Sequence, residues 1–371
     1  MRTKRILTLL SSVSLALVLA IPLLLACAAP TPIPTPAPTT SPTTSPTTSP
    51  SPEPSAEVFK WKFASWAPRG IYYFDEIYCG FCRELEEVSG GRIEVEPLGV
   101  GELVGWGNTF DALQAGVVDI ACPFVASYKS IIPEMNCAYG LPVGLRSGRE
   151  VLELIWERGW EEILQEAYLE QGVHYLSPDV WNPMYTVTSV PCETLDELRA
   201  LKIKATGGGA DLLEKLGGTA VTIASAEVYM SIATGVIDGA LGVDLGELYN
   251  YKFYEFAKYI MQPPFLAAVA GADYLVTEDT WNSLPEDLQY VLYATARLYS
   301  GQGDVKFTKD ERQGTLKMLE AGCEYVALDD AGVKELNEAA LEMWDEVAAL
   351  SPRNAQMMEI YEEFMRELGY L

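Results

Sequence analysis

Apolar residues alternate between strand-like and helix-like spacings along most of the chain from residue 58 onward. The run 58–68 alternates apolar and polar residues, which predicts a strand, and 71–91 has helical spacing and ends in two glycines. A strand at 92–99, a short helix at 106–116 and a strand at 117–124 follow in the same order. Strands that alternate with helices in this way predict an α/β fold with parallel strands.

A second series of strands and helices follows one long predicted helix at 147–172. Its members are strands at 173–178, 184–190, 201–205, 220–223 and 236–242, with helices at 209–217 and 226–235. The chain then returns through a strand at 267–276 to the first series. We expect a long helix from Leu284 to about Arg312 that spans both halves, and an amphipathic helix at 333–351 that covers the outside.

One short pattern occurs twice, at Ala112–Ala121 and again at Ser231–Ala240. Each copy reads as the end of an apolar helix, a glycine, two β-branched residues and an aspartate. Gly116 and Gly235 fit the C-cap of the helix, and the aspartates that open the next strand are Asp119 and Asp238. Each copy is therefore the helix-to-strand return of a β-α-β unit. Two α/β lobes of this kind predict a ligand cleft between them.

The N-terminus has the features of a lipoprotein signal peptide at residues 1–26. A basic start with Arg2, Lys4 and Arg5 precedes an apolar run from Ile6 to Leu25, and Leu24–Cys27 closes it with a small residue before cysteine. Cleavage there would leave Cys27 as a lipidated N-terminus. The alternative is an ordinary transmembrane anchor, and both readings place the rest of the chain outside the cytoplasm.

Residues 27–56 form a tether rich in Pro, Thr, Ser and Ala, a composition that favours extended polyproline II. The whole chain carries 26 basic and 52 acidic residues. Loss of residues 1–26, which hold three bases and no acid, changes the net charge from −26 to −29. Such an acidic surface excludes nucleic acid as a partner.

Candidate catalytic chemistry is sparse. His174 is the one histidine, it lies in a predicted strand, and no nucleophile motif accompanies it. Cys79 and Cys82 have the spacing of a thiol redox site, but they fall two turns inside a predicted helix and not at its N-terminus, where the first thiol would be activated. We therefore predict no catalytic residue, no cofactor and no metal site.

Three segments together resemble the solute receptors of TRAP transporters, the tripartite periplasmic carriers. Residues 89–121 resemble the first lobe of these receptors, 195–240 are similar to the second-lobe signature, and 279–298 resemble their late Trp, Leu-Pro and long helix. The resemblance runs from about Phe59 to Arg366, and it is closer to the branch that binds keto acids and related carboxylates.

This resemblance implies an α/β, two-lobed periplasmic-binding-protein-like fold with a ligand cleft between the lobes and a long spanning helix. The implied function is an extracytoplasmic receptor that captures a small organic acid and delivers it to a membrane permease. The expected divisions are lobe 1 at 57–180, lobe 2 at 181–265, and a return to lobe 1 with the C-terminal helices at 266–371. Two alternatives remain: a sensor-associated binding protein for a small polar ligand, and an extracytoplasmic enzyme.

The resemblance also points to ligand-binding residues. An arginine that ends the "LKIR"-type strand grips the carboxylate in the family, and Lys204 takes that place here. The Glu-Trp pair that helps to hold a metal ion in the keto-acid branch is replaced by Leu241-Gly242. Loops after the strands supply further candidates for the cleft: Trp66, Arg69, Trp106, Asn108, Tyr128, Trp181, Asn182, Asp244 and Glu247.

Overall fold

A computed structural model describes residues 57–223 and 225–371, which belong to one compact unit. The side chains at 225, 226, 243 and 247 are not described. The predicted signal peptide, Cys27 and the tether lie outside the described residues. No described helix combines the length and the apolar character that crossing a bilayer requires.

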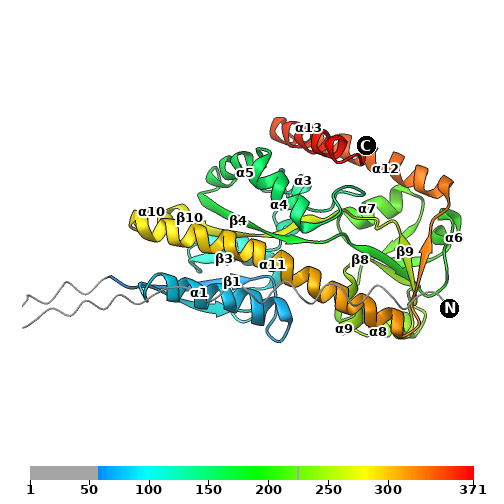
Figure 1. Cartoon of the computed structure of the whole chain (residues 1–371), viewed down its shortest axis with the longest axis horizontal. Coiled ribbons are helices and arrows are strands. Elements are labelled where there is room, and N and C mark those ends of the chain that lie inside the picture. The colour runs from blue at the N-terminus through cyan, green and yellow to red at the C-terminus, as the bar shows by residue number, and fades with distance from the viewer. Residues whose placement is uncertain (1–56, 224) are drawn as a thin grey trace, which may run out of the picture. The chain divides into compact units, whose positions relative to one another are not determined.

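The first sheet has the strand order β2-β1-β3-β10-β4 and defines the first lobe (Figure 1). Its strands are β1 (Phe59–Ser65), β2 (Ile93–Leu98), β3 (Ile120–Cys122), β4 (Val173–Trp181) and β10 (Val269–Thr277). In β1, Trp61 and Phe63 point into the core and Lys60 points to solvent, as the alternation predicted. β2 and β3 pair with β1 in parallel, whereas β10 runs antiparallel to both β3 and β4.

The second sheet has the order β11-β9-β5-β8-β6-β7 and defines the second lobe. Its strands are β5 (Tyr185–Thr188), β6 (Lys202–Lys204), β7 (Thr219–Val221), β8 (Gly239–Val243), β9 (Tyr259–Gln262) and β11 (Glu324–Ala327). β6 lies between β7 and β8 and runs parallel to both, whereas β5 is antiparallel to β8 and β9.

The two copies of the repeated pattern adopt the same hydrogen-bonded corner, one in each lobe. Gly116 and Gly235 have φ of 66° and 70°, a left-handed conformation that favours glycine. The carboxylates of Asp119 and Asp238 accept hydrogen bonds of 2.8 Å from the backbone N–H groups of Lys62 and Lys202. The prediction of a matched helix-to-strand return in each lobe is confirmed.

Helices and helical turns accompany the first sheet. They are η1 (Tyr73–Tyr78), α1 (Cys79–Val88), η2 (Trp106–Asn108), α2 (Thr109–Gln114), η3 (Val125–Ser127), α3 (Met135–Ala138), α4 (Gly148–Glu157) and α5 (Trp160–Leu169). The prediction of one long helix at 147–172 is wrong. The helix is interrupted at Gly159, whose φ of 97° cannot continue a right-handed helix, and α5 begins at the next residue.

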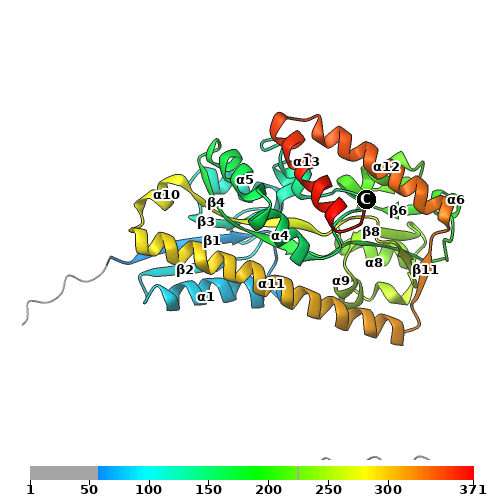
Figure 2. The ribbon, with the colours of Figure 1, turned by 45° about the horizontal axis from the view of Figure 1, so that its top comes forward.

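The second lobe contains α6 (Leu195–Arg199), α7 (Gly208–Lys215), α8 (Ser225–Ala233), α9 (Leu245–Asn250) and η4 (Phe253–Glu255). α10 (Glu278–Ser283) then precedes α11 (Glu286–Glu320), which is longer than the predicted Leu284–Arg312. α11 runs along both lobes (Figures 1 and 2): Leu288 and Leu292 lie in a core cluster of the first lobe, and Met318 in one of the second. It is the predicted spanning helix.

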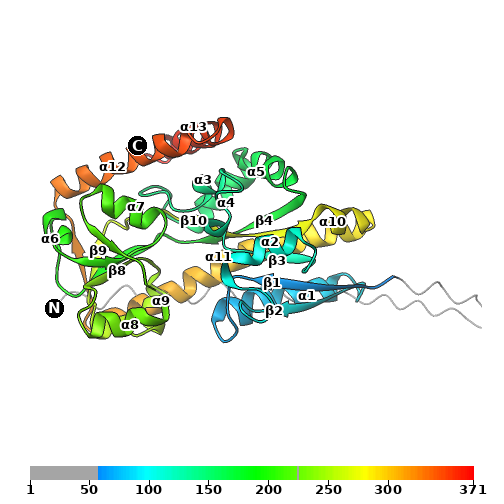
Figure 3. The ribbon, with the colours of Figure 1, turned by 180° about the vertical axis from the view of Figure 1, so that it is seen from behind.

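The C-terminal segment contributes to both lobes. β11 pairs with β9 in the second sheet. The chain after residue 266 therefore contributes to the second lobe as well as to the first. α12 (Asp330–Ala348) buries Leu336 in the core of the second lobe, and α13 (Pro352–Glu367) buries Phe364 in the core of the first. Both helices lie on the opposite side of the sheets from α11 (Figures 1 and 3).

Candidate functional site

An aromatic cluster forms where three strands of the first sheet end. β1, β3 and β4 run in the same direction, so the residues that end or follow them meet at one edge of the sheet. The rings of Trp66 and Trp181 have centroids 5.1 Å apart, and Phe124 stacks on Trp181 at 5.7 Å. Tyr73 from η1 joins them, 5.4 Å from Trp66 and 6.3 Å from Trp181.

Trp181 is held against the backbone of the neighbouring strand. A register shift in the pairing of β10 with β4 falls between Ala270 and Ala272. A Cβ atom at Gly271, the residue between them, would come within 2.2 Å of the indole of Trp181. Only glycine therefore leaves room for this ring, and the bulge fixes where Trp181 lies.

A buried carboxyl lies next to the cluster. Trp66 Nε1 donates to the hydroxyl of Tyr78 (2.5 Å), which donates to Asp179 Oδ2 (2.6 Å). Burial raises the pKa of Asp179 to about 7, although the hydroxyl of Tyr78 and the indoles of Trp181 and Trp66 act to lower it. Trp181 Nε1 is buried and has no hydrogen bond of ordinary geometry, and the hydroxyl of Tyr73 is buried with no partner at all.

The second lobe presents Lys204 and Asp244 at the carboxyl ends of β6 and β8. Lys204 is 8% exposed, Asp244 is half-buried, and both side chains have interaction partners. Asp244 lies close enough to the first lobe to raise the pKa of Tyr73, after burial and Asp179. The backbones also meet, because a Cβ atom at Gly208 would fall 2.2 Å from the carbonyl oxygen of Gly140. The two lobes therefore contact each other beside these residues.

Asn182 connects three elements at the junction of the lobes. Its Oδ1 accepts from the N–H of Gly148 (3.1 Å), and its Nδ2 donates to Thr308 Oγ1 (3.1 Å) and Glu311 Oε2 (2.7 Å) on α11. Burial raises the pKa of Glu311 to about 7; Asn182 acts to lower it and Asp244 to raise it. Glu311 thus belongs to the same electrostatic environment as Asp244.

The other predicted site residues are placed differently. Arg69 forms an ion pair with Glu102, donates to the carbonyl of Pro97 (2.7 Å) and covers the ring of Phe74. Trp106 is 51% exposed and packs on Phe124 at 5.0 Å.

Three candidates do not join the cluster through a described side-chain contact. Tyr128 is buried in the first lobe, stacked on Phe110, and its hydroxyl lies 2.7 Å from that of Tyr168. Asn108 is exposed at the end of η2. Glu247 lies on α9, and its side chain is outside the described part.

The sequence reasoning did not select Tyr73, Asp179 or Glu311. Asp179 carried a usable signal, because it is an acidic residue in a mostly apolar strand and charged residues are rarely fully buried without a reason. Tyr73 and Glu311 carried none, since each lies inside a predicted helix and neither follows a predicted strand.

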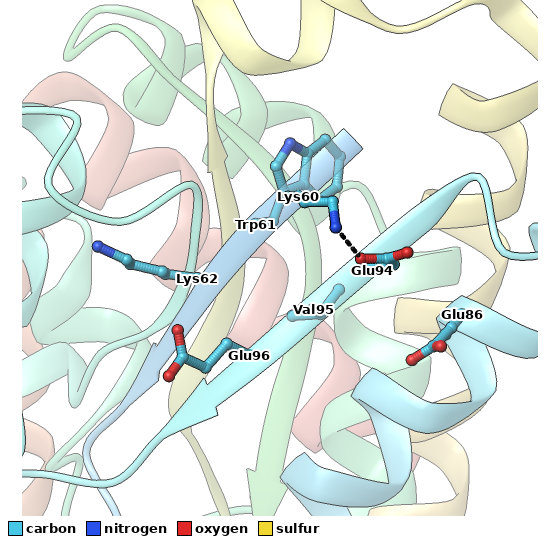
Figure 4. A pocket seen from close by; sticks show the side chains of 7 residues that line it. All are labelled: Lys60, Trp61, Lys62, Glu86, Glu94, Val95 and Glu96. Carbon is cyan, nitrogen blue, oxygen red and sulfur yellow. Dashed lines mark ion pairs between the residues drawn. The ribbon is translucent and has the colours of Figure 1, made fainter. Parts of the chain in front are cut away.

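A shallow, open pocket of about 410 Å³ lies elsewhere, over β1, β2 and α1 (Figure 4). Its lining is mostly charged, and Lys60 forms an ion pair with Glu94 across the two strands. None of the predicted ligand-binding residues lines it.

The described cysteines are all free thiols, and Cys79 and Cys82 lie on α1 directly after the π-helical turn η1. Burial raises the pKa of both thiols, which is the opposite of what a redox-active thiol needs. Among the residues that the structure describes, no three His, Cys, Asp or Glu side chains come together in a way that could hold a metal ion.

Residues 63–350 match the family profile of DctP, the bacterial extracellular solute-binding protein family 7. A monocarboxylate 2-oxoacid-binding periplasmic protein of Nostoc sp. is 22% identical over 77% of this chain and 79% of its own length. A TRAP solute-binding protein from Pseudoalteromonas atlantica, with bound sodium and pyruvate, superposes with a TM-score of 0.75 at 19% identity, covering 84% of this chain and 95% of its own.

A third comparison has a different ligand. A TRAP solute-binding protein from Chromohalobacter salexigens, with bound (S)-(+)-2-amino-1-propanol, gives a TM-score of 0.73 at 23% identity and covers 84% of this chain and 96% of its own. At such identities the solved structures show a shared two-lobed fold. The family profile spans both lobes and most of the chain: this protein belongs to family 7 of the bacterial extracellular solute-binding proteins, the receptors of TRAP transporters.

Proposed function

We propose that this protein captures a small organic acid between its two lobes and delivers it to the membrane subunits of a TRAP transporter. The family match over residues 63–350 carries the proposal. Two relatives support the ligand class: the Nostoc protein is named for 2-oxoacids, and the Pseudoalteromonas structure holds pyruvate. The proposed cycle is capture, closure and release, with no bond made or broken.

We place the binding region at the junction of the lobes, with the aromatic cluster of the first lobe on one side and Lys204 and Asp244 of the second on the other. Lys204 would be the principal cation for a carboxylate, as a point charge without the two-pronged geometry of arginine. Trp66, Trp181 and Asn182 would line the same space, and Arg69 and Trp106 would lie at its margin. No described side-chain contact connects the remaining three candidates with this region: Tyr128, Asn108 and Glu247.

Ligand identity and closure can be tested together. We expect the full-length protein to retain a small solute, identified by mass spectrometry after denaturation, and to become more compact when that solute is restored. The hinges would be the crossover segments 181–190 and 261–268, where β4 passes to β5 and β9 to β10. X-ray scattering measures the change. Identical curves with and without saturating solute would contradict closure.

Lipid anchoring is a separate part of the proposal, supported by the sequence around Cys27 alone. We expect Cys27→Ala to prevent lipidation and the cleavage that depends on it, so that the protein keeps residues 1–26 and its N-terminal peptide carries no lipid, because the thiol is the attachment point. Cell fractionation with the mass of the N-terminal peptide measures both effects. Cys79→Ala, a thiol change within α1, is the matched control and should stay membrane-bound. A Cys27→Ala protein that is still processed and still sediments with membranes would contradict the anchor.

A further inference from the structure

We infer that the captured solute carries a protonated amine as well as its acid group, and that Trp66, Tyr73 and Trp181 receive this amine. The ligand class would then be small amino acids and similar zwitterions. The inference rests on the proposed function, because it concerns the same junction between the lobes. We refer to these three side chains as the ring cage.

The ring cage has the composition of a cation site. Its three rings pack on one another with centroids 5.1, 5.4 and 6.3 Å apart and planes inclined by 60°, 54° and 67°, so their faces point in different directions. The faces of Trp and Tyr rings attract cations within about 6 Å of the centroid. Phe124 stacks on Trp181, and this contact restricts the orientation of the indole.

Carboxyl groups from three segments lie near this cage: Asp179 and Asp244 act on Tyr73, and Glu311 accepts from Asn182, the residue after Trp181. Asp179 lies two residues before the end of β4 and accepts from the hydroxyl of Tyr78, which itself accepts from Trp66 Nε1. Asp244 follows β8, and both aspartates act electrostatically on Tyr73. Glu311 lies one helical turn beyond Phe307, whose ring is 5.7 Å from that of Tyr73. Burial raises the pKa of Asp179 and of Glu311 to about 7, and a cation bound at this place would favour the ionised form of both carboxyls.

The hydroxyl of Tyr73 is an independent indication that something polar belongs here. Tyr73 is only 8% exposed, and its hydroxyl has no hydrogen-bond partner. A buried hydroxyl without a partner costs about 1–3 kcal/mol, so such groups are rare unless a ligand completes them. The oxygen of Tyr73 can accept a hydrogen bond from an ammonium group, and its O–H can donate to a carboxylate, so a polar group of a zwitterion would complete it.

The described part of the junction between the lobes contains few basic side chains that would repel a cationic group of the solute. Among the described lysines and arginines, Lys204 alone is buried below a tenth of its surface, and Arg69 is engaged by Glu102. A solute with only carboxylates would place its negative charge among Asp179, Asp244 and Glu311. A zwitterion can place its carboxylate toward Lys204 and its ammonium in the ring cage.

Matched solutes separate the two groups. Four solutes share a three-carbon frame. Alanine carries both the acid and the amine, lactate carries only the acid, 2-amino-1-propanol carries only the amine, and 1,2-propanediol carries neither. Leucine, 2-hydroxy-4-methylpentanoate, leucinol and 4-methylpentane-1,2-diol repeat the design on a larger frame. With the full-length protein freed of retained solute, calorimetry should show the amino acid of at least one frame binding about tenfold or more tighter than its hydroxy acid.

Two variants connect this preference to the cage. Glu311→Gln keeps the size of the side chain and should reduce the preference for the amino acid over the hydroxy acid, whereas Glu320→Gln, exposed on the same helix, should not. Tyr73→Phe should lower amino-acid affinity without loss of thermal stability, because its hydroxyl has no protein partner to lose. Tyr274→Phe removes another unpartnered buried hydroxyl, away from the cage, and should leave affinity unchanged.

The outcomes distinguish the two proposals. Equal or tighter binding of the hydroxy acids, or no binding of either amino acid and either amino alcohol, would overturn the ammonium inference while acid binding upheld the proposed function. A preference that survives both Glu311→Gln and Tyr73→Phe would place the amine elsewhere and also overturn it. If no solute binds and none co-purifies, the proposed function itself fails.

Discussion

Replacing Lys204 with Met should weaken solute binding by at least tenfold while the fold stays intact. Lys204 is buried at the carboxyl end of β6, where the resemblance to the family places the carboxylate-binding cation. A buried carboxylate that loses its cationic partner costs about 2–5 kcal/mol. Methionine keeps most of the side-chain length and deletes the charge, so lost packing contributes little. Isothermal calorimetry with the solute identified from the purified protein measures the effect.

Two companion variants make the result specific to position and geometry. Lys202→Met removes the same charge from the exposed start of the same strand and should leave affinity unchanged. Lys204→Arg restores a cation with a planar fork, so a carboxylate should bind as well or more tightly. Unchanged affinity in Lys204→Met would show that Lys204 does not hold the solute, and the acid component of the ligand would lose its main support.

Short-range patterns predicted much of the fold because local chemistry determines those parts. The glycine and aspartate of the repeated corner act within a few residues of themselves, so Gly116 and Asp119 could be assigned from sequence, as could their counterparts in the second lobe. The prediction of an uninterrupted helix at 147–172 was wrong for a reason that is also local. The apolar spacing continues past Gly159, and only its backbone conformation shows that the helix stops.

The site was less predictable because its members come from distant segments. Trp66, Trp181 and Asn182 could be selected, since each follows a strand and strand ends converge. Glu311 reaches the junction only because α11 extends along both lobes and places this residue next to Asn182. Tyr128 follows a strand as well, yet its ring turns into the core to meet Phe110 and Tyr168. Position after a strand does not determine the direction of a side chain.

Asp273→Asn should stabilise the protein at pH 8 and have a much smaller effect at pH 5. Asp273 lies on β10 with no exposed surface; it accepts from the hydroxyl of Tyr168, and its other oxygen has no partner. Burial raises its pKa from 3.8 to about 7, with Tyr168 acting to lower it and Asp179 to raise it. In the unfolded chain the same group ionises near its ordinary pKa.

The sign of the effect follows from the proton balance. Between pH 4 and 7 the folded protein keeps the proton on Asp273 and the unfolded chain loses it, so stability falls as pH rises through this window and levels off above about pH 7. The full loss is on the order of 4 kcal/mol for one such group. Asparagine cannot ionise and still offers Tyr168 an acceptor, which removes this loss at pH 8.

Denaturant unfolding of the wild type and Asp273→Asn at pH 5 and pH 8 measures the prediction, with the solute removed from both. Asp179 and Glu311 also have pKa values raised to about 7, so the wild type should lose stability over this interval and the variant should lose less. Asp345→Asn, at an exposed position on α12, is the matched control and should follow the wild type at both pH values. If Asp273→Asn has the same pH dependence as the wild type, Asp273 is already ionised in the folded protein at pH 5, and its buried charge must be stabilised by a group other than Tyr168.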